Sequence, residues 1–284
     1  MAYICIIAKK NCMITAQELV LFSLKSKIKI ASAISSKWGA KIAFNIFCTP
    51  FRKPRDVPPP IFKESEEFTI AVDGYSIHGY CWNKLSTKRA LILHGFESRA
   101  YNFDRYIVPL LNKGYAVFAM DGKAHGKSEG KTTNAPEYAE MIRVLEEKTG
   151  KFDTFISHSF GGIALCLFQE AYNNPAAKMV LIAPATETKS AIALFSSFFG
   201  LGEKIKEAIL RHIQEKSGRA ASFFSINRIA PQLVNPILWI HDKDDDITPL
   251  SDVKPLMELS PSNIEFMVTS GLGHRKIYKD AIIR

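Results

Sequence analysis

The sequence predicts an α/β fold in which a mostly parallel central sheet carries helices on both faces. Strand-like runs rich in β-branched and aromatic residues alternate with helical patterns from about residue 62 to the end of the 284-residue chain. This alternation is typical of parallel sheets. The hydrophobic fraction of 47% and the charged fraction of 23% are those of a globular protein with a large core. We therefore expect an α/β domain over residues 61–284, preceded by a separate segment over residues 1–60.

The N-terminal segment is predicted to be a basic, amphipathic helical arm. Residues 15–47 have a helical pattern whose apolar stripe repeats every four residues, at Ile30, Ile34, Trp38, Ile42 and Ile46. Residues 1–55 hold ten Lys or Arg and one acidic residue, Glu18, so the whole net charge of +9 lies there. Residues 52–60 read as a Pro-rich, basic linker. Because a nucleic-acid enzyme would carry its positive charge around the active cleft, no nucleic-acid partner is expected.

Two interpretations of the arm stay open. Its apolar stripe docks on the α/β domain or on a second subunit, or residues 15–55 contact an anionic membrane surface. No apolar run approaches the ~20 residues that a membrane span needs. Lys25, Lys27 and Lys29 interrupt the most apolar stretch, which argues against a signal peptide. Met1 and Met13 are both candidate starts, and the oligomeric state is left open.

The elements of the α/β domain follow in chain order. A hairpin is predicted over residues 68–82, because two strand-like runs flank Asp73-Gly74, a strong signal for a tight turn. The next elements are strand 90–93, helix 102–111, strand 115–120, helix 135–147, strand 152–156, a helix after Ser159, and strand 179–182. Strand 237–240, helix 251–259, strand 264–268 and a short C-terminal helix complete the domain.

A helical insertion interrupts this alternation at about residues 188–233. It lies between two predicted strands, is rich in phenylalanine, and is longer than one crossover between parallel strands needs. We expect it to form a small lid over the sheet; the alternative is an ordinary pair of packing helices.

The stretch around Ser159 is the predicted centre of a site. A short strand runs into Ser157-His158-Ser159-Phe160-Gly161, and a helical pattern follows at once. This is typical of a nucleophile elbow, a sharp turn that holds a serine in a strained conformation between small neighbours. Ser157 stands where glycine is usual. The alternative interpretation is a turn rich in serine and glycine that carries no chemistry.

Four further stretches accompany this turn, and each lies at or just after the end of a predicted strand. They are residues 91–97 with His94-Gly95-Phe96, residues 121–128, the Asp-rich residues 239–249, and residues 271–274. In motif content, order and spacing, residues 62–284 resemble the α/β-hydrolase superfamily, and in particular its serine esterases and lysophospholipases.

The resemblance implies a catalytic triad. Ser159 matches the nucleophile, His274 the general base and Asp245 the acid, with Asp244 as the rival for the acid. The chemistry is consistent, because a serine hydroxyl becomes a good nucleophile only when a neutral imidazole takes its proton. That imidazole needs a carboxylate to fix its tautomer. The chain order of serine, aspartate and histidine is also the order of this fold.

The resemblance further implies an oxyanion hole made by the backbone N–H groups of Phe160 and Phe96. Three histidines match supporting positions. His94 is expected to shape its loop, His125 to support structure or line the pocket, and His158 to point away from the nucleophile.

The implied reaction is hydrolysis of a carboxylic ester or thioester through an acyl-serine intermediate, without a metal ion or organic cofactor. The Phe-rich insertion favours an apolar acyl group. The alternatives are a peptidase, a C–C hydrolase, or a catalytically silent scaffold that binds a partner or a membrane surface. An odd number of scattered cysteines favours a reducing, cytoplasmic location, with membrane contact through the arm as an addition; they are Cys5, Cys12, Cys48, Cys81 and Cys166.

Overall fold

The computed structural model describes residues 16–51, 57–281 and 283, which divide into two compact units. The sheet unit comprises Pro50–Thr186 and the chain from Ser225 onward. The helical unit comprises the chain up to Thr49 together with Glu187–Phe224. The candidate start at Met13, and residues 52–56 of the predicted linker, lie outside the described residues.

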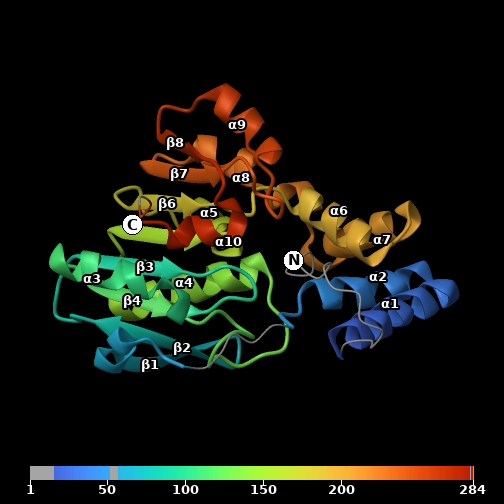
Figure 1. The fold of residues 1–284 in the computed structure, drawn as a ribbon, viewed down its shortest axis with the longest axis horizontal. Helices are drawn as coiled ribbons and strands as arrows, with labels where there is room; N and C mark the ends of the chain where they lie inside the picture. Colours follow the sequence, from blue (N-terminus) through green and yellow to red (C-terminus); the bar gives the residue numbers. More distant parts are fainter. Residues whose placement is uncertain (1–15, 52–56, 282, 284) are drawn as a thin grey trace. The chain divides into compact units, whose positions relative to one another are not determined.

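The sheet unit is built on an eight-stranded sheet with the strand order β1-β2-β4-β3-β5-β6-β7-β8 (Figure 1). The β1–β2 and β2–β4 pairs are antiparallel, and the pairs from β4 through β8 are parallel. The strands are β1 (Glu66–Val72), β2 (Tyr75–Trp82), β3 (Arg89–Leu93), β4 (Ala116–Met120), β5 (Thr154–His158), β6 (Lys178–Ile182), β7 (Ile237–Asp242) and β8 (Ile264–Thr269). The helices of this unit are α3 (Asp104–Asn112), α4 (Ala135–Thr149), α5 (Phe160–Tyr172), α8 (Ile226–Ile229), α9 (Lys254–Leu259) and α10 (Gly273–Lys276). The predicted α/β fold with a mostly parallel sheet is confirmed.

Burial explains why the central strands read as continuous apolar runs. Every residue of β4 and of β5 is buried, because each strand has a neighbour on both sides and helices cover both faces of the sheet (Figure 1). The carboxyl ends of β3, β5, β6, β7 and β8 therefore form one edge, at which the loops with the predicted motifs begin.

The predicted hairpin is also present. β1 and β2 pair up to Val72 and Tyr75, and the two residues between them, Asp73 and Gly74, have φ angles of 48° and 80°. Two left-handed residues in succession match the twist of the flanking strands. The helices predicted at 102–111 and 251–259 start as short 3-10 turns, at Ala100–Phe103 and Leu250–Asp252.

The helical unit contains α1 (Ala16–Ile34), α2 (Ser36–Phe47), α6 (Thr188–Phe199) and α7 (Glu203–Ser217). The helical pattern over residues 15–47 is therefore two helices. Ser35 separates them with an extended backbone, and its side chain accepts a hydrogen bond from the Trp38 N–H at 3.4 Å as the N-cap of α2. No described helix is both long enough and apolar enough to cross a membrane.

The break at Ser35 moves the predicted apolar stripe off the packed face. Ile30, Ile34 and Trp38 are 63%, 71% and 46% exposed. The buried residues of the two helices include Ile28, Ala31, Gly39, Ala40, Ala43 and Ile46. A step of four stays near one face only along an uninterrupted helix, so the first three residues of this stripe do not lie on the side that packs within the helical unit.

α2 packs against the two helices of the insertion. Phe44 lies edge-on to His212 of α7, and Phe47 lies edge-on to Phe195 of α6, each with ring centroids 5.4 Å apart. The N-terminal arm and the insertion thus belong to one unit. Residues 225–233, which the sequence assigned to the insertion, belong to the sheet unit.

Candidate active site

Ser159 lies in a sharp turn between β5 and α5. Its backbone φ of 52° and ψ of −119° are strained for a residue with a side chain. Two backbone hydrogen bonds hold the turn: the Ser159 N–H donates to the Ile182 carbonyl at 3.0 Å, and the Ala185 N–H donates to the Ser159 carbonyl at 2.9 Å. The neighbouring strand and its following loop therefore impose the geometry of a nucleophile elbow.

The residues two before and two after Ser159 have little space. A Cβ on Gly161 would lie 2.7 Å from the Leu93 carbonyl oxygen and 2.8 Å from that of His94. Ser157 is fully buried, and its hydroxyl donates to the Val180 carbonyl at 3.2 Å. A serine replaces the usual glycine there because its small side chain finds a hydrogen-bond acceptor on the adjacent strand.

His274 connects Ser159 with Asp245. The Nε2 atom of His274 lies 2.9 Å from the Ser159 Oγ, and its Nδ1 atom lies 2.8 Å from an Asp245 carboxylate oxygen. The three side chains come from the turn after β5, the loop after β7 and α10 after β8, and each residue is 8% exposed or less. With the Nδ1 proton donated to the carboxylate, Nε2 is left to accept the serine proton.

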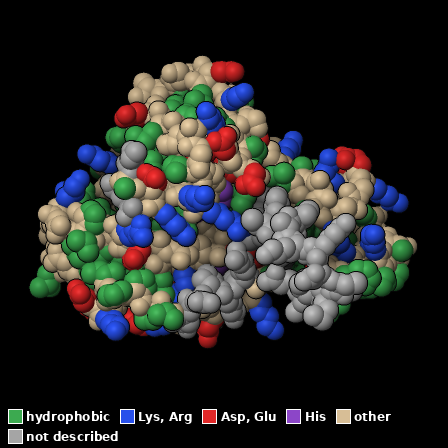
Figure 2. Space-filling model, in the orientation of Figure 1, with side chains coloured by type: hydrophobic (Ala, Val, Ile, Leu, Met, Phe, Trp, Pro, Cys, Tyr) green, Lys and Arg blue, Asp and Glu red, His purple; other side chains and the backbone are tan. Residues whose placement is uncertain are grey.

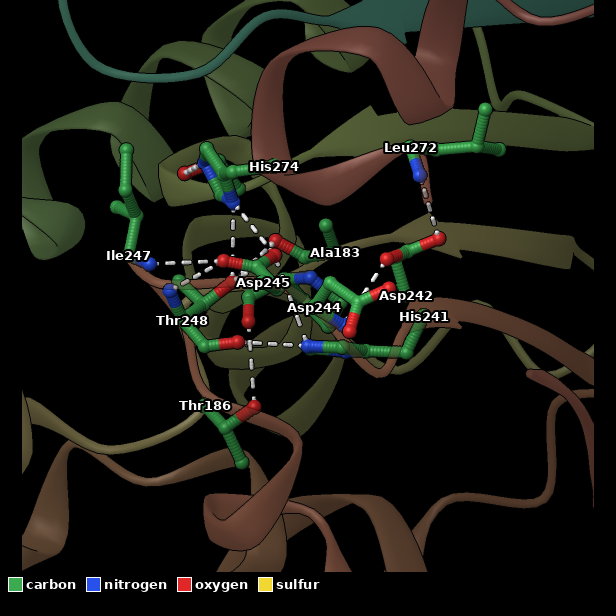
Figure 3. Close-up of polar contacts among 12 residues, drawn as sticks. Ala183, Thr186, His241, Asp242, Asp244, Asp245, Ile247, Thr248, Leu272 and His274 are labelled. Atoms are coloured by element: carbon green, nitrogen blue, oxygen red, sulfur yellow. Dashed lines mark hydrogen bonds and ion pairs between the residues drawn. The ribbon is translucent and has the colours of Figure 1, made fainter. Parts of the chain in front are cut away.

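Asp245 is surrounded by hydrogen-bond donors (Figure 3). Its carboxylate accepts from the backbone N–H groups of Ile247 at 2.9 Å and Thr248 at 2.8 Å, and from the Thr248 hydroxyl at 2.9 Å. Burial acts to raise the pKa of Asp245, but the hydrogen bond and charge of His274, together with these N–H donors, hold the pKa below its usual value. Asp245 is therefore a carboxylate at neutral pH.

The neighbouring acids have a different role. The Asp244 carboxylate accepts from the Gly271 N–H at 2.7 Å. Asp242 accepts from the Thr269 hydroxyl at 2.7 Å and from the Leu272 N–H at 3.2 Å. Both side chains tie the end of β7 and its following loop to the loop that leads to His274. Figure 3 shows the contact between Asp242 and Leu272.

Sequence reasoning missed Thr248 and the role of His241. The Thr248 hydroxyl lies 3.1 Å from His274 Nδ1 in addition to its bond with Asp245. His241 accepts from the Trp239 indole N–H at 3.3 Å, so its Nε2 carries the proton and donates to the Thr248 carbonyl at 2.6 Å. Burial lowers the pKa of His241. The only signal in the sequence was the position of Thr248 beside the candidate acid.

His158 contacts both the backbone and the ring of His274. Its Nε2 lies 3.1 Å from the His274 carbonyl oxygen and its ring centroid 4.4 Å from that of Tyr278. Burial, and then the proximity of His274, lower the pKa of His158 well below its usual value. A neutral His158 that donates to this carbonyl holds the backbone of His274 in place.

The loop after β3 is held by two histidines. His94 donates from Nδ1 to the Gly95 carbonyl at 2.7 Å and accepts from the Gly122 N–H at 2.8 Å. His125 accepts from the Glu97 N–H at 3.0 Å and donates to the Lys123 carbonyl at 2.9 Å. Burial, and then His94, lower the pKa of His125 to about 3. His125 is thus a neutral structural residue whose acceptor nitrogen fixes the end of this loop.

Phe96 and Phe160 lie next to each other beside Ser159. Their rings meet edge-to-face with centroids 5.7 Å apart, and both residues are partly exposed. A Cβ on Gly95 would lie 2.9 Å from the Ser159 Cβ, so the loop backbone passes close to the serine. Phe160 is the first residue of α5, and N–H groups in a first turn have no intrahelical acceptor. These are the two backbone groups that the sequence predicted for the oxyanion hole.

Among the described residues, no group of three or more His, Cys, Asp or Glu could hold a metal ion. Three of the five cysteines, Cys48, Cys81 and Cys166, are buried. Cys5 and Cys12 lie outside the described residues.

Comparison with known sequences finds one matching protein family. The model described as serine aminopeptidase, S33, matches residues 86–228. An uncharacterized Bacillus subtilis protein, YqkD, is 25% identical over 69% of this chain and 69% of its own length. A probable serine hydrolase of Drosophila melanogaster is 26% identical, but the match covers 41% of this chain and only 37% of the fly protein.

Comparison with solved structures gives the same fold. A Pyrococcus furiosus esterase superposes with a TM-score of 0.61 at 21% identity, covering 81% of this chain and 90% of the esterase. A Butyrivibrio proteoclasticus protein, Est1E, solved with ferulic acid bound, gives a TM-score of 0.58 at 18% identity, covering 74% of this chain and 91% of that protein. At these identities the likeness concerns the fold.

Proposed function

The chain belongs to the serine aminopeptidase S33 family of α/β-hydrolases, and from that premise we propose that it cleaves a carboxylic ester or thioester with an apolar acyl group. The hydrolase class follows from the family; the bond cleaved, the acyl-serine intermediate and the residue roles are the proposal. The proposed chemistry requires no metal ion or organic cofactor.

The hydrogen-bonded chain from Ser159 through His274 to Asp245 carries this proposal. Both links are short, at 2.9 Å and 2.8 Å, and the three residues are nearly buried. A water-poor position strengthens these interactions and keeps the imidazole in one orientation. The lowered pKa of Asp245 supports its role as the charged partner of the histidine.

In the proposed mechanism, the Ser159 Oγ attacks the carbonyl carbon of the substrate while His274 Nε2 takes its proton. Asp245 stabilises the imidazolium that forms, and the tetrahedral oxyanion accepts hydrogen bonds from the Phe96 and Phe160 N–H groups. The intermediate collapses as His274 gives its proton to the leaving alkoxide or thiolate. A water molecule, deprotonated by His274, then hydrolyses the acyl-serine and releases the acid.

The surroundings of Ser159 support an apolar acyl group. The partly exposed rings of Phe96 and Phe160 lie beside the nucleophile. An apolar surface at this position favours acyl chains over charged groups, because burying an unpaired charge is costly.

We also propose that the helical insertion acts as a lid. Its two ends are joined at the carboxyl end of β6, where the Ile226 N–H donates to the Thr186 carbonyl at 2.9 Å. Ala185, the residue before Thr186, is bonded to the turn that holds Ser159: its N–H donates to the Ser159 carbonyl at 2.9 Å. The insertion therefore leaves the sheet unit directly beside the proposed nucleophile, which is where a lid must be anchored.

A peptidase is the second candidate, and the name of the matching family favours it. The same triad cleaves amides as well as esters. A peptidase that removes N-terminal residues must bind a free ammonium group, whereas an esterase for apolar acyl groups need not. The substrate panel below separates the two.

The first test is labelling of the full chain with a fluorophosphonate, beside the Ser159→Ala variant. We expect labelling of the wild type only, together with turnover of p-nitrophenyl esters that rises with acyl chain length. Ser159→Ala should lower kcat by at least about 10³-fold, because only binding and oxyanion stabilisation remain. Aminoacyl p-nitroanilides, offered in parallel, should be poor substrates.

Each other outcome has a defined meaning. A folded wild type that is not labelled and does not turn over either panel would contradict the hydrolase mechanism and favour a catalytically silent scaffold. Labelling at Ser159 with turnover of the anilides alone would keep the nucleophile and replace the esterase with the peptidase.

A further inference from the structure

α1 has a second apolar face that the helical unit leaves exposed. The large exposed apolar side chains of α1 are Leu19 (54%), Val20 (51%), Phe22 (72%), Ile30 (63%) and Ile34 (71%). At about 100° per residue, Phe22, Leu19, Ile30 and Ile34 fall within an arc of about 120° on one side of the helix. We call these four residues the exposed face of α1.

The exposed face is separate from the side of α1 that packs within the unit. Ile28 and Ala31 are 0% and 1% exposed and lie on the other side of the helix. Ser32 meets Gly39 of α2 so closely that a Cβ on the glycine would lie 2.8 Å from the Ser32 Cα. A helix in a globular protein usually has one apolar stripe and a polar opposite face, so a second apolar face indicates a second apolar environment.

Basic residues border the exposed face on both sides. On the same helical projection, Lys27 lies just beyond Ile34 and Lys29 just beyond Phe22, and both lysines are exposed. Figure 2 shows both hydrophobic side chains and Lys or Arg side chains on the visible surface of the helical unit. An apolar strip with lysines along both edges is the pattern of a helix that lies in the interface of an anionic bilayer.

We propose that the exposed face of α1 binds the surface of an anionic lipid bilayer, with the helix lying in the plane of the interface. Insertion of the four apolar side chains removes them from water, while Lys27 and Lys29 reach lipid phosphate and carboxylate groups. No described helix, α1 included, is both long enough and apolar enough to cross a bilayer. A protein partner would need an apolar groove with acidic side chains along its edges, whereas every anionic bilayer offers an apolar interior beneath negatively charged headgroups.

The binding does not depend on the proposed hydrolase activity, so it is tested separately. The full chain is sedimented with phosphatidylcholine vesicles that contain or lack phosphatidylserine. We expect binding to the mixed vesicles that weakens in high salt, and at least about tenfold weaker binding to phosphatidylcholine alone. Ile30→Ser combined with Ile34→Ser should lower binding to the mixed vesicles by at least about tenfold.

A matched control also replaces two exposed apolar side chains with serine, but in the sheet unit instead of α1. Leu85 and Val234 of the sheet unit are 97% and 66% exposed, so Leu85→Ser with Val234→Ser removes comparable exposed apolar side chains. This control should bind mixed vesicles as the wild type does. Lys27→Glu with Lys29→Glu should abolish the dependence on phosphatidylserine.

A spectroscopic test locates the contact. Trp82 and Trp239 are buried and Trp38 is exposed, so Phe22→Trp in a Trp38→Phe background places the one exposed tryptophan on the exposed face of α1. Its emission should shift to the blue on mixed vesicles.

Three results would overturn the proposal. They are a folded wild type that stays in the supernatant with mixed vesicles, binding that the Ile30→Ser and Ile34→Ser pair leaves unchanged, or sedimentation without a blue shift. A dimer in analytical ultracentrifugation that the same pair of substitutions dissociates, with no vesicle binding, would identify a second copy of the chain as the occupant instead.

Discussion

Asp244 and Asp245 are adjacent in sequence and make different contacts. Asp245 bonds to His274 at 2.8 Å and accepts two backbone N–H groups of its own loop, whereas Asp244 accepts from Gly271 at 2.7 Å. The first contact orients an imidazole, and the second orients a loop. This difference allows two identical substitutions to be compared one residue apart.

We predict that Asp245→Asn lowers kcat for a good ester substrate by about 10³- to 10⁴-fold, because an amide cannot hold His274 in the reactive tautomer. Asp244→Asn should cost less than about tenfold, because an amide oxygen can still accept from Gly271. Steady-state kinetics of both variants checks this. Equal losses in the two variants would contradict the assignment of Asp245 as the acid.

At the level of elements, α1 and α2 pack closely at Gly39. An added Cβ would lie 2.1 Å from the Ser32 Oγ and 2.8 Å from the Ser32 Cα. The serine hydroxyl can move, but the Cα belongs to the backbone of α1. Gly39 therefore sets the distance between two helices, and its lack of a side chain is a packing requirement.

We predict that Gly39→Ala destabilises the helical unit by about 1–3 kcal/mol through overpacking, although alanine favours helix by about 1 kcal/mol. Amide hydrogen exchange in α1 and α2 should become faster, and exchange in the sheet unit should not change. Gly202→Ala is the control, because a Cβ there meets nothing within 4 Å and φ is −69°. Slower exchange in α1 and α2 of Gly39→Ala would show that the contact relaxes.

At the level of the whole molecule, four histidines of the sheet unit are kept neutral by burial. His94, His125, His158 and His241 all have a lowered pKa, with burial as the first cause in each case. In the unfolded chain each would titrate near ~6.5. Below that pH the unfolded state binds more protons than the folded state, so acid favours unfolding.

We predict that the free energy of unfolding falls as the pH drops below about 6.5, and continues to fall toward the pKa of His125 at about 3. Each such histidine adds a slope of up to about 1.4 kcal/mol per pH unit. Urea midpoints measured between neutral pH and mildly acidic pH check this. His125→Gln should reduce the slope, and an unchanged slope in that variant would contradict a neutral His125.

Much of the sheet unit could be predicted from the sequence because its signals are local. The turn at Asp73-Gly74 and the buried strands around Ser159 are set by nearby residues. The approach of Ser159 and His274 could also be anticipated, since each follows a strand of one parallel sheet and such strands end at a common edge.

The remaining features depend on contacts that local patterns do not contain. Nothing in a helical period marks Ser35 as a break, because serine is only mildly unfavourable within a helix. The packing of Phe44 on His212 joins segments that lie far apart in sequence. The bonds of Asp242 and Thr248 to the loop and the ring of His274 arise from tertiary structure alone.

The composition of the helical unit has a consequence for synthesis of the chain. α1 and α2 are translated before the sheet segment, whereas α7, which packs against α2, ends only at Ser217. At roughly 5–20 residues per second, a ribosome takes on the order of ten seconds to translate the intervening sheet segment. During that time the side of α2 that packs against α6 and α7 has no native partner. A nascent chain that has not yet reached α7 therefore exposes this apolar surface of α2, to which chaperones can bind. Synthesis of the complete insertion allows α6 and α7 to cover it.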